Sequence, residues 1–291
     1  EGNSKDSYCF DIHSGAFGNK GLKQHLEDTW TIVPDISQVG DFPALTKARS
    51  AFFALYDGHA GRSAAEFCAE KLHVNIASKI EIPSENESVR KAIFDGFKET
   101  DTTFLALAAS KNYKDGCTAV TATIVQDIMF VAWVGDSKAV LARRESEDAQ
   151  SRVKALNITK DHSCIQAKER ERIVKSGGFI ENNRVNGIME VSRSIGDIFL
   201  KKSGVICTPE IQRITLCDRD EFLLLACDGL WRVYDAKDAC EYVLKGFREG
   251  YDEETICQNL VREAIRVRQA HDNVSALLIR FKQRTAAHGS V

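Results

Sequence analysis

The amino-acid sequence predicts an α+β fold in which strands and helices form separate layers. Short runs rich in β-branched and aromatic residues are bounded by turn residues, as is typical of buried strands. Other segments repeat apolar residues every three to four positions, as amphipathic helices do. Along the chain the order is strand-rich sequence, a helix pair, many strands and then further helices. Because strands and helices do not alternate regularly, this order favours α+β layers over a doubly wound parallel sheet.

The expected elements follow from these two periodicities. The strands are Trp30–Val33, Ala51–Tyr56, Ala119–Val125, Met129–Val134, Ala139–Ala142, Phe222–Cys227 and Val274–Phe281. The helices are Ser63–Ile80, Ser88–Ala109, Gln166–Ser176, Ala236–Arg248 and Glu253–Arg268. Asp235 is expected to cap a helix, and Gly177 and Gly250 are expected to follow helix ends.

Charge and hydropathy argue against several classes of partner. The 291 residues carry a net charge of −3, and the most basic stretch, Lys168–Lys175, alternates in sign like a solvated helix face. No nucleic-acid partner is therefore expected. No apolar run approaches the roughly 18 residues of a membrane-spanning helix, so no membrane partner is expected either.

Cysteine usage and the absence of linkers indicate one intracellular domain. The nine cysteines include no C-x-x-C pair, which fits free thiols in a reducing compartment, cytoplasmic or nuclear. We expect a single monomeric domain over residues 7–283, with frayed ends at 1–6 and 284–291.

Aspartates recur at the ends of the expected core strands. Asp57, Asp136 and Asp228 each follow such a strand closely, whereas Asp28 and Asp272 each precede one. One aspartate of this kind is ordinary turn chemistry. Five are harder to explain in that way, because converging strand ends would place several carboxylates together, where they repel and shift one another's pKa.

Divalent cations would relieve this repulsion. The donors are oxygen atoms without the Cys/His spacing of a zinc site, which favours Mg²⁺ or Mn²⁺. Two such ions about 4 Å apart can activate a bridging water and clamp a phosphoryl group, as phosphate-ester hydrolysis requires. His59, two residues after Asp57, could protonate the leaving oxygen; the alternative is a partly buried structural histidine.

Ten ordered segments carry a family likeness. They are Lys23–Asp28, Phe52–Gly61, Asp115–Val120, Trp133–Lys138, Lys168–Ile173 with Gly177-Gly178, Arg184–Gly187, Val191–Asp197, Pro209-Glu210, Leu225–Trp231 and Asp272-Asn273. On these segments, which span about residues 8–282, the chain resembles the PPM family of type 2C metal-dependent serine/threonine protein phosphatases. Within that family it resembles most the subfamily of integrin-linked-kinase-associated phosphatases.

The resemblance implies a four-layer α-β-β-α sandwich with two central antiparallel sheets and a two-metal centre at one end. It implies that phosphoserine and phosphothreonine in proteins are the substrates. The implied site residues are Asp57 bridging both metals, the Gly58 carbonyl, Asp228 and Asp272 as further ligands, Glu27 and Asp28 through water, His59 as general acid, Asp136 at a third metal and Arg184 beside an active-site flap.

Two positions depart from the family pattern. Lys23 stands where the family usually has the arginine that grips the substrate phosphate, so the bidentate fork is lost and a higher KM is expected. Arg232 stands where many relatives have an aspartate of the third-metal site, so weaker binding of that metal is expected.

Two other readings are weighed against the active enzyme. A scaffold with lost chemistry is disfavoured because Asp57, Asp228 and Asp272 are all present. A two-metal nuclease is disfavoured by the acidic charge balance and the lack of a basic stripe.

Overall fold

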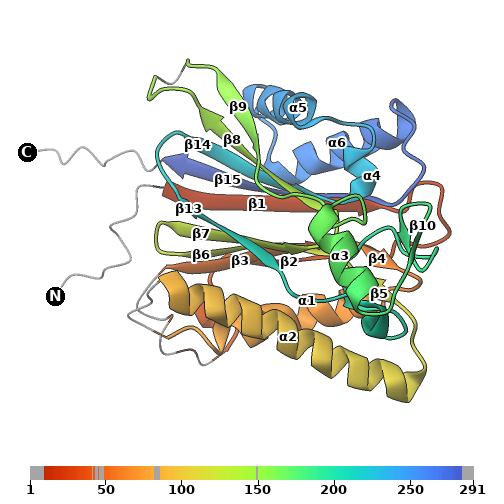
Figure 1. Ribbon diagram of the computed structural model, residues 1–291. Coiled ribbons are helices and arrows are strands. Elements are labelled where there is room, and N and C mark those ends of the chain that lie inside the picture. The colour runs from red at the N-terminus through yellow and green to blue at the C-terminus, as the bar shows by residue number, and fades with distance from the viewer. Residues whose placement is uncertain are drawn as a thin grey trace, which may run out of the picture.

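Two five-stranded antiparallel sheets form the centre of the structure (Figure 1). The computed structural model describes residues 10–40, 42, 45, 49–81, 86–148 and 150–283, so the ends expected to be frayed, 1–6 and 284–291, lie outside it. The first sheet has the order β1 (Phe10–Asn19), β15 (Val274–Gln283), β14 (Asp220–Ala226), β8 (Lys138–Arg144) and β9 (Val153–Asn157). The second has the order β13 (Glu210–Thr215), β7 (Ile128–Val134), β6 (Ala119–Val125), β3 (Ser50–Tyr56) and β2 (Thr29–Val33).

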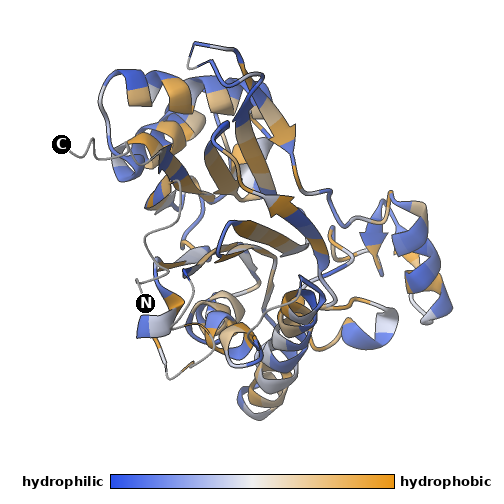
Figure 2. Cartoon of the chain, turned by 90° about the vertical axis from the view of Figure 1, so that its left-hand side faces the viewer, coloured by the Kyte–Doolittle hydropathy of each residue, from blue (hydrophilic) through white to orange (hydrophobic). Residues whose placement is uncertain are grey.

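The central strands are buried on both faces, which explains their continuous apolar sequence. On β3, Phe53 and Leu55 enter the core between the two sheets, whereas Phe52 and Tyr56 enter the core beneath the helices. This division follows from the two-residue period of a strand. Strand β14 behaves in the same way, with Leu223 and Leu225 between the sheets and Phe222 and Leu224 facing the opposite helices. Figure 2 shows apolar residues concentrated on the strands and polar residues on the outer helix surfaces.

Helices cover both outer faces, which completes four layers (Figure 1). Helices α1 (Ser63–Ala77) and α2 (Asn86–Lys111) pack on the second sheet, and α4 (Asp228–Trp231), α5 (Ala236–Arg248) and α6 (Glu253–Arg266) cover the first. The Asp235 carboxylate accepts from the Asp238 amide at 2.7 Å, as expected for a cap worth about 1 kcal/mol. Gly177 and Gly250 follow α3 (Ala167–Lys175) and α5, with φ of 84° and 82°. Among the helices described, none is both long and apolar enough to cross a membrane.

The predicted α+β class is confirmed, and the four layers implied by the family likeness are present. All seven expected strands and five expected helices form, with ends shifted by a few residues. Three strands of the two large sheets, β1, β9 and β13, were missed. In β1 two glycines weaken the strand pattern; Gly15 is needed there because a Cβ atom would lie 2.2 Å from the Glu254 backbone nitrogen of α6.

Smaller elements gather at one end of the sandwich, where Figure 1 labels β4, β5, β10 and α4. A three-stranded sheet has the order β12 (Ile195–Gly196), β5 (Gly116–Cys117) and β4 (Gly58–His59). Residues 163–191, here called the flap segment, contain α3 (Ala167–Lys175), β10 (Ile180–Glu181) and β11 (Arg184–Val185). An antiparallel bridge between Ser163 and Val191 joins its two ends. Short 3₁₀ turns lie at Ile36–Gln38 and Lys201–Ser203.

Candidate functional site

The three-stranded sheet brings together three segments that are far apart in the sequence. Gly58 and His59 pair with Cys117 and Gly116 of β5, and β12 pairs with the other edge of β5. The Thr118 amide donates to the Asp57 carbonyl at 2.9 Å, which fixes the turn that leaves β3. Close packing requires glycine at two of these positions. A Cβ atom on Gly58 would lie 2.4 Å from the Glu27 carbonyl oxygen, and one on Gly116 would lie 2.2 Å from the Asp197 carboxylate.

Five carboxylates from five different strand ends lie close together, and the charges of their neighbours help to raise the pKa of four of them. Burial raises the pKa of Asp57 well above its usual value, and the charges of Asp28, Asp228, Asp136 and Asp272 raise it further. Burial likewise raises the pKa of Asp136 to about 7 and that of Asp28 to about 6. Such mutual repulsion is relieved when cations bind among the carboxylates.

Asn273 ties the loop that carries Lys23, Glu27 and Asp28 to the start of β15. Its side-chain oxygen accepts from the Glu27 amide at 2.8 Å, and its side-chain nitrogen donates to the carbonyls of Lys20 and His25 at 3.0 Å each. These three hydrogen bonds hold the loop against the residue next to Asp272. Asp28 is buried. Its carboxylate oxygens make no hydrogen bond of ordinary geometry, although Ser275 and Cys227 lie close enough to offset part of the effect of burial on its pKa. An orphaned buried carboxylate is costly, so these oxygens require a donor such as bound water.

Two cations are paired with the acidic cluster. Lys23 Nζ lies 3.0 Å from Asp272 Oδ1. Arg232 Nε and Nη2 lie 2.9 and 2.5 Å from Asp228 Oδ2. Both positions are the ones where the sequence departs from the family pattern. These two side chains compensate the carboxylates that the sequence identifies as direct metal ligands.

His59 forms an ion pair that sequence reasoning did not assign. Its Nε2 lies 3.0 and 2.9 Å from the two carboxylate oxygens of Asp197, which also accepts from Ser194 Oγ at 2.5 Å. Burial acts to lower the pKa of His59, but the hydrogen bond and charge of Asp197, with Asp136 and Glu27, raise it overall. The pair favours a protonated imidazole with a fixed orientation. Asp197 belongs to a segment of the family likeness, but its role is visible only through this contact.

The flap segment is linked to the acidic cluster by alternating charges. Arg184 donates to the Ile188 carbonyl at 2.9 Å and pairs with Glu190. Glu190 Oε2 in turn lies 3.2 Å from Arg232 Nη2, and Arg232 binds Asp228. The chain of ion pairs therefore runs from the flap segment to an expected metal ligand.

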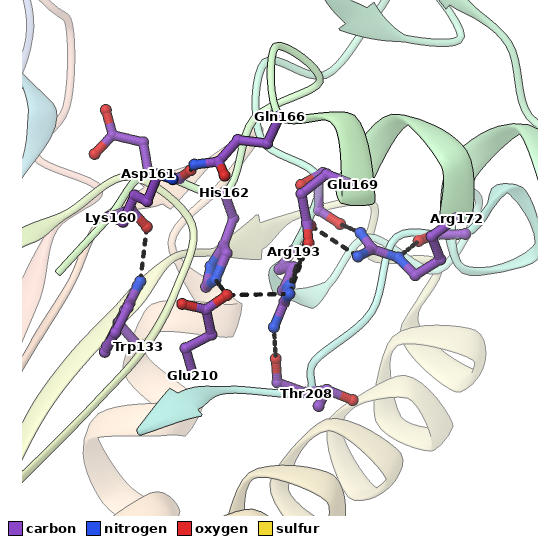
Figure 3. Close-up of polar contacts among 12 residues, drawn as sticks. Trp133, Lys160, Asp161, His162, Gln166, Glu169, Arg172, Arg193, Thr208 and Glu210 are labelled. Atoms are coloured by element: carbon purple, nitrogen blue, oxygen red, sulfur yellow. Dashed lines mark hydrogen bonds and ion pairs between the residues drawn. The ribbon is translucent and has the colours of Figure 1, made fainter. Parts of the chain in front are cut away.

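A buried histidine, His162, supports the loop that carries Asp136, and Figure 3 shows its contact with Glu210. His162 Nδ1 accepts from the Gly135 amide at 3.2 Å, and the His162 amide donates to the Gly135 carbonyl at 2.9 Å. Its ring stacks on Trp133 at a centroid separation of 5.9 Å. Burial lowers the pKa of His162 to about 3, so the ring is neutral and carries its proton on Nε2, which lies 3.5 Å from Glu210 Oε1.

The base of the flap segment is held by a second part of the same network (Figure 3). Glu169 on α3 is buried and accepts from Arg193 Nη2 at 2.6 Å and from Ser192 Oγ at 2.5 Å. Arg172 Nη1 lies 2.8 Å from the same carboxylate. Although burial opposes it, these partners lower the pKa of Glu169 to about 2. The contacts fix the orientation of α3 relative to the residues that lead into β12.

A cavity of about 620 Å³ joins these parts. Every residue that the sequence analysis assigned to the site lines it except Asp28, which is buried and acts on Asp57 through its charge. Asp197, Thr118, Glu190 and Lys114 also line it but were not assigned a role. The sequence carried no sufficient signal for Asp197, Thr118 and Glu190, because each contacts a residue that is distant along the chain: His59, Ser137 and Arg232, respectively.

The residues present fit divalent metal ions. The donors are carboxylate and carbonyl oxygens, as Mg²⁺ and Mn²⁺ prefer, and two carboxylate oxygens are buried without a partner. As now arranged, no three His, Cys, Asp or Glu side chains of the described residues form a group tight enough to hold one ion. One oxygen of each of two expected ligands is paired instead with Lys23 or Arg232, so these cations compete with metal ions for Asp272 and Asp228.

Comparisons with known proteins agree with this geometry. Residues 12–274 match the family model described as protein phosphatase 2C. The chain is 41% identical over 291 residues to probable protein phosphatase 2C 8 of Arabidopsis thaliana, covering 96% of this chain and 82% of the relative. It is 36% identical over 292 residues to the integrin-linked kinase-associated serine/threonine phosphatase 2C of Mus musculus, covering 94% and 74%.

A solved structure shares the fold. The crystal structure of serine-threonine phosphatase 2C from Toxoplasma gondii superposes with a TM-score of 0.80 over 96% of this chain and 97% of that one, at 22% identity. At 22% identity this structural similarity is evidence for the fold alone. The family assignment depends on the sequence matches. The chain belongs to the protein phosphatase 2C family of metal-dependent serine/threonine protein phosphatases.

Proposed function

We propose that the chain hydrolyses phosphoserine and phosphothreonine in proteins at the cavity that contains the acidic cluster. The observation that carries this proposal is the convergence of five buried or partly buried carboxylates. In four of them, Asp28, Asp57, Asp136 and Asp228, burial and the neighbouring carboxylates raise the pKa. The proposed direct metal ligands are Asp57, the carbonyl of Gly58, Asp228 and Asp272, with Glu27 and Asp28 acting through water. Two Mg²⁺ or Mn²⁺ ions, when bound there, would supply an activated water.

His59 is the proposed general acid. The leaving group is a serine or threonine alkoxide, which needs a proton as the P–O bond breaks. His59 lines the cavity, and its pairing with Asp197 both favours the protonated ring and restrains its direction. Asp197 is thus a positioning residue in this proposal.

Lys23 and Arg184 are the proposed cationic contacts on either side of the cavity. Lys23 is 55% exposed at its side chain and offers a point charge to phosphate, without the fork of an arginine. Arg184 lines the cavity from the flap segment. Asp136 is the proposed ligand of a third metal, which the nearby positive charge of Arg232 disfavours.

We further propose that one domain over residues 7–283 acts as a monomer on phosphorylated proteins inside the cell. The family match over residues 12–274 supports the single domain. The eight cysteines that the structure describes are all free, which supports a reducing compartment.

The proposal is tested by hydrolysis of a phosphothreonine peptide with and without added Mn²⁺. We expect no turnover after chelation, recovery on adding Mn²⁺, and a loss of at least about a hundredfold in Asp228→Asn. Asp127→Asn, which changes an exposed carboxylate in the turn between β6 and β7, is the matched control and should retain activity. Turnover without metal, or full activity in Asp228→Asn, would contradict the proposed centre.

A further inference from the structure

Two large apolar side chains are exposed beside the acidic cluster. Ile188 is 67% exposed and Phe199 is 65% exposed, yet both line the cavity that contains Asp57 and His59. Exposed apolar groups are common one at a time. Two at the rim of a reactive cavity are better explained by contact with what enters it.

The flap segment holds Ile188 in a fixed turn. The Ile188 amide donates to the Val185 carbonyl at 2.9 Å, and the Ile188 carbonyl accepts from Arg184 Nη1 at 2.9 Å. Val185 and Met189 pair as an antiparallel bridge that closes this turn. Val185 is fully buried, and Met189 packs on the same small core. The backbone that presents Ile188 is therefore restrained on both sides.

Phe199 is held by a second turn that is anchored in the same core. The Leu200 amide donates to the Asp197 carbonyl at 2.8 Å, and Leu200 is buried with Val185 and Ile173. Lys201 Nζ donates to the Ser194 carbonyl at 2.9 Å and pairs with Asp101. Because one core anchors both turns, the spacing between Ile188 and Phe199 is set by packing.

The adjoining polar groups indicate which molecule meets this apolar surface. The Phe199 turn begins at Asp197, the partner of His59, and the Ile188 turn is bound by Arg184. A chain whose phosphorylated residue enters the cavity would place its neighbouring side chain against Ile188 and Phe199. We propose that these two residues form a subsite for an apolar side chain that flanks the phosphoserine or phosphothreonine of a protein substrate. The inference rests on the proposed function and narrows its substrate class.

The experiment compares phosphothreonine peptides that differ only in one flanking residue, Leu or Ser, placed before or after the phosphorylated residue. With Mn²⁺ present, we expect the Leu peptide to have about tenfold higher kcat/KM on at least one side, the effect of partly burying a leucine. The ratio of kcat/KM for the Leu peptide to kcat/KM for the Ser peptide should fall toward one in the double variant Ile188→Ser with Phe199→Ser. Val174→Ser is the matched control, because Val174 is 57% exposed on α3 but does not line the cavity.

A blocked phosphothreonine without flanking side chains separates the two proposals. No hydrolysis of this compound or of either peptide would contradict the proposed function itself. Its hydrolysis together with equal kcat/KM for the Leu and Ser peptides would contradict the subsite alone. An unchanged Leu preference in the double variant would also overturn the subsite, as would self-association of the native chain that the double variant abolishes, since a second copy would then cover the surface.

Discussion

Arg232 should compete with metal ions for Asp228. Its two nitrogens bind one carboxylate oxygen at 2.9 and 2.5 Å, and its charge also acts on Asp136. An ion that uses Asp228 as a ligand must either separate this pair or bind the other carboxylate oxygen, Oδ1, against the positive charge of Arg232. Replacing the guanidinium by a neutral amide in Arg232→Gln removes the competing charge, so metal ions should bind more tightly.

The size of the effect follows from the exposure of the pair. The Arg232 side chain is 55% exposed and that of Asp228 is 21% exposed, so solvent screens the attraction. Charge-assisted hydrogen bonds in such a setting are worth about 1–2 kcal/mol, which corresponds to about 5- to 30-fold in dissociation constant. We expect Arg232→Gln to bind Mn²⁺ more tightly by about this factor. Arg232→Asp should in addition bind a further Mn²⁺ ion near Asp136.

Isothermal titration calorimetry measures the dissociation constant for Mn²⁺ without relying on enzymatic activity. Lys237→Gln is the matched control, because Lys237 has the same charge and also pairs with a carboxylate four residues later, at 3.7 Å on α5. It should leave the affinity for Mn²⁺ within about twofold of the native value, since an exposed pair contributes little. The reasoning would be refuted by an Arg232→Gln variant that binds Mn²⁺ no more tightly than the native chain.

Three further outcomes follow from single contacts. Lys23→Arg should lower KM for a phosphothreonine peptide by about 3- to 10-fold by restoring a bidentate contact; an equal or higher KM counts against it. Asp197→Asn should slow phosphothreonine hydrolysis by about 10- to 100-fold but act less on p-nitrophenyl phosphate, whose leaving group needs no proton from His59. Glu169→Gln should lower the free energy of unfolding at pH 7 by about 3 kcal/mol, because Arg193 and Arg172 both lose the charge of this buried carboxylate. Since the folded pKa of Glu169 is about 2, against about 4.3 unfolded, its contribution is present above pH 4.3 and lost as pH falls toward 2. Urea unfolding of both proteins should therefore show the difference shrinking in acid, and a constant difference would exclude this origin.

The strands of the core could be predicted because their burial is visible locally. β14 contains the apolar run Phe222–Ala226, and the apolar run of β6 is interrupted only by Thr121 and Thr123, which are also buried, since one face packs on a sheet and the other on helices. Strand β13 was missed because it is an edge strand with mostly exposed or half-buried residues. β9 is also an edge strand, and its alternation is too weak to separate it from a loop.

Most of the candidate site could be identified from the sequence because metal chemistry requires particular residue types. A charged carboxylate beside an apolar strand destabilises the fold unless a cation or hydrogen bonds compensate its charge. Asp57, Asp228 and Asp272 can therefore each be recognised in the sequence. The two cations that pair with Asp272 and Asp228 cannot be recognised in this way, because Lys23 and Arg232 resemble ordinary surface residues until their partners are known. Their unusual positions could be seen only against the family pattern.

The sequence by itself determined the layered fold class, the acidic cluster and the family likeness, because these depend on hydrophobic period, residue type and segment order. Only the tertiary structure decided that His59 pairs with Asp197 and that His162 supports the Gly135 backbone beside Asp136. It also decided that Ile188 and Phe199 share one cavity rim. The physical reason is that these contacts join residues on separate turns and strands. Their proximity is set by sheet pairing and by the small core beneath the flap segment, which no local pattern of residues records.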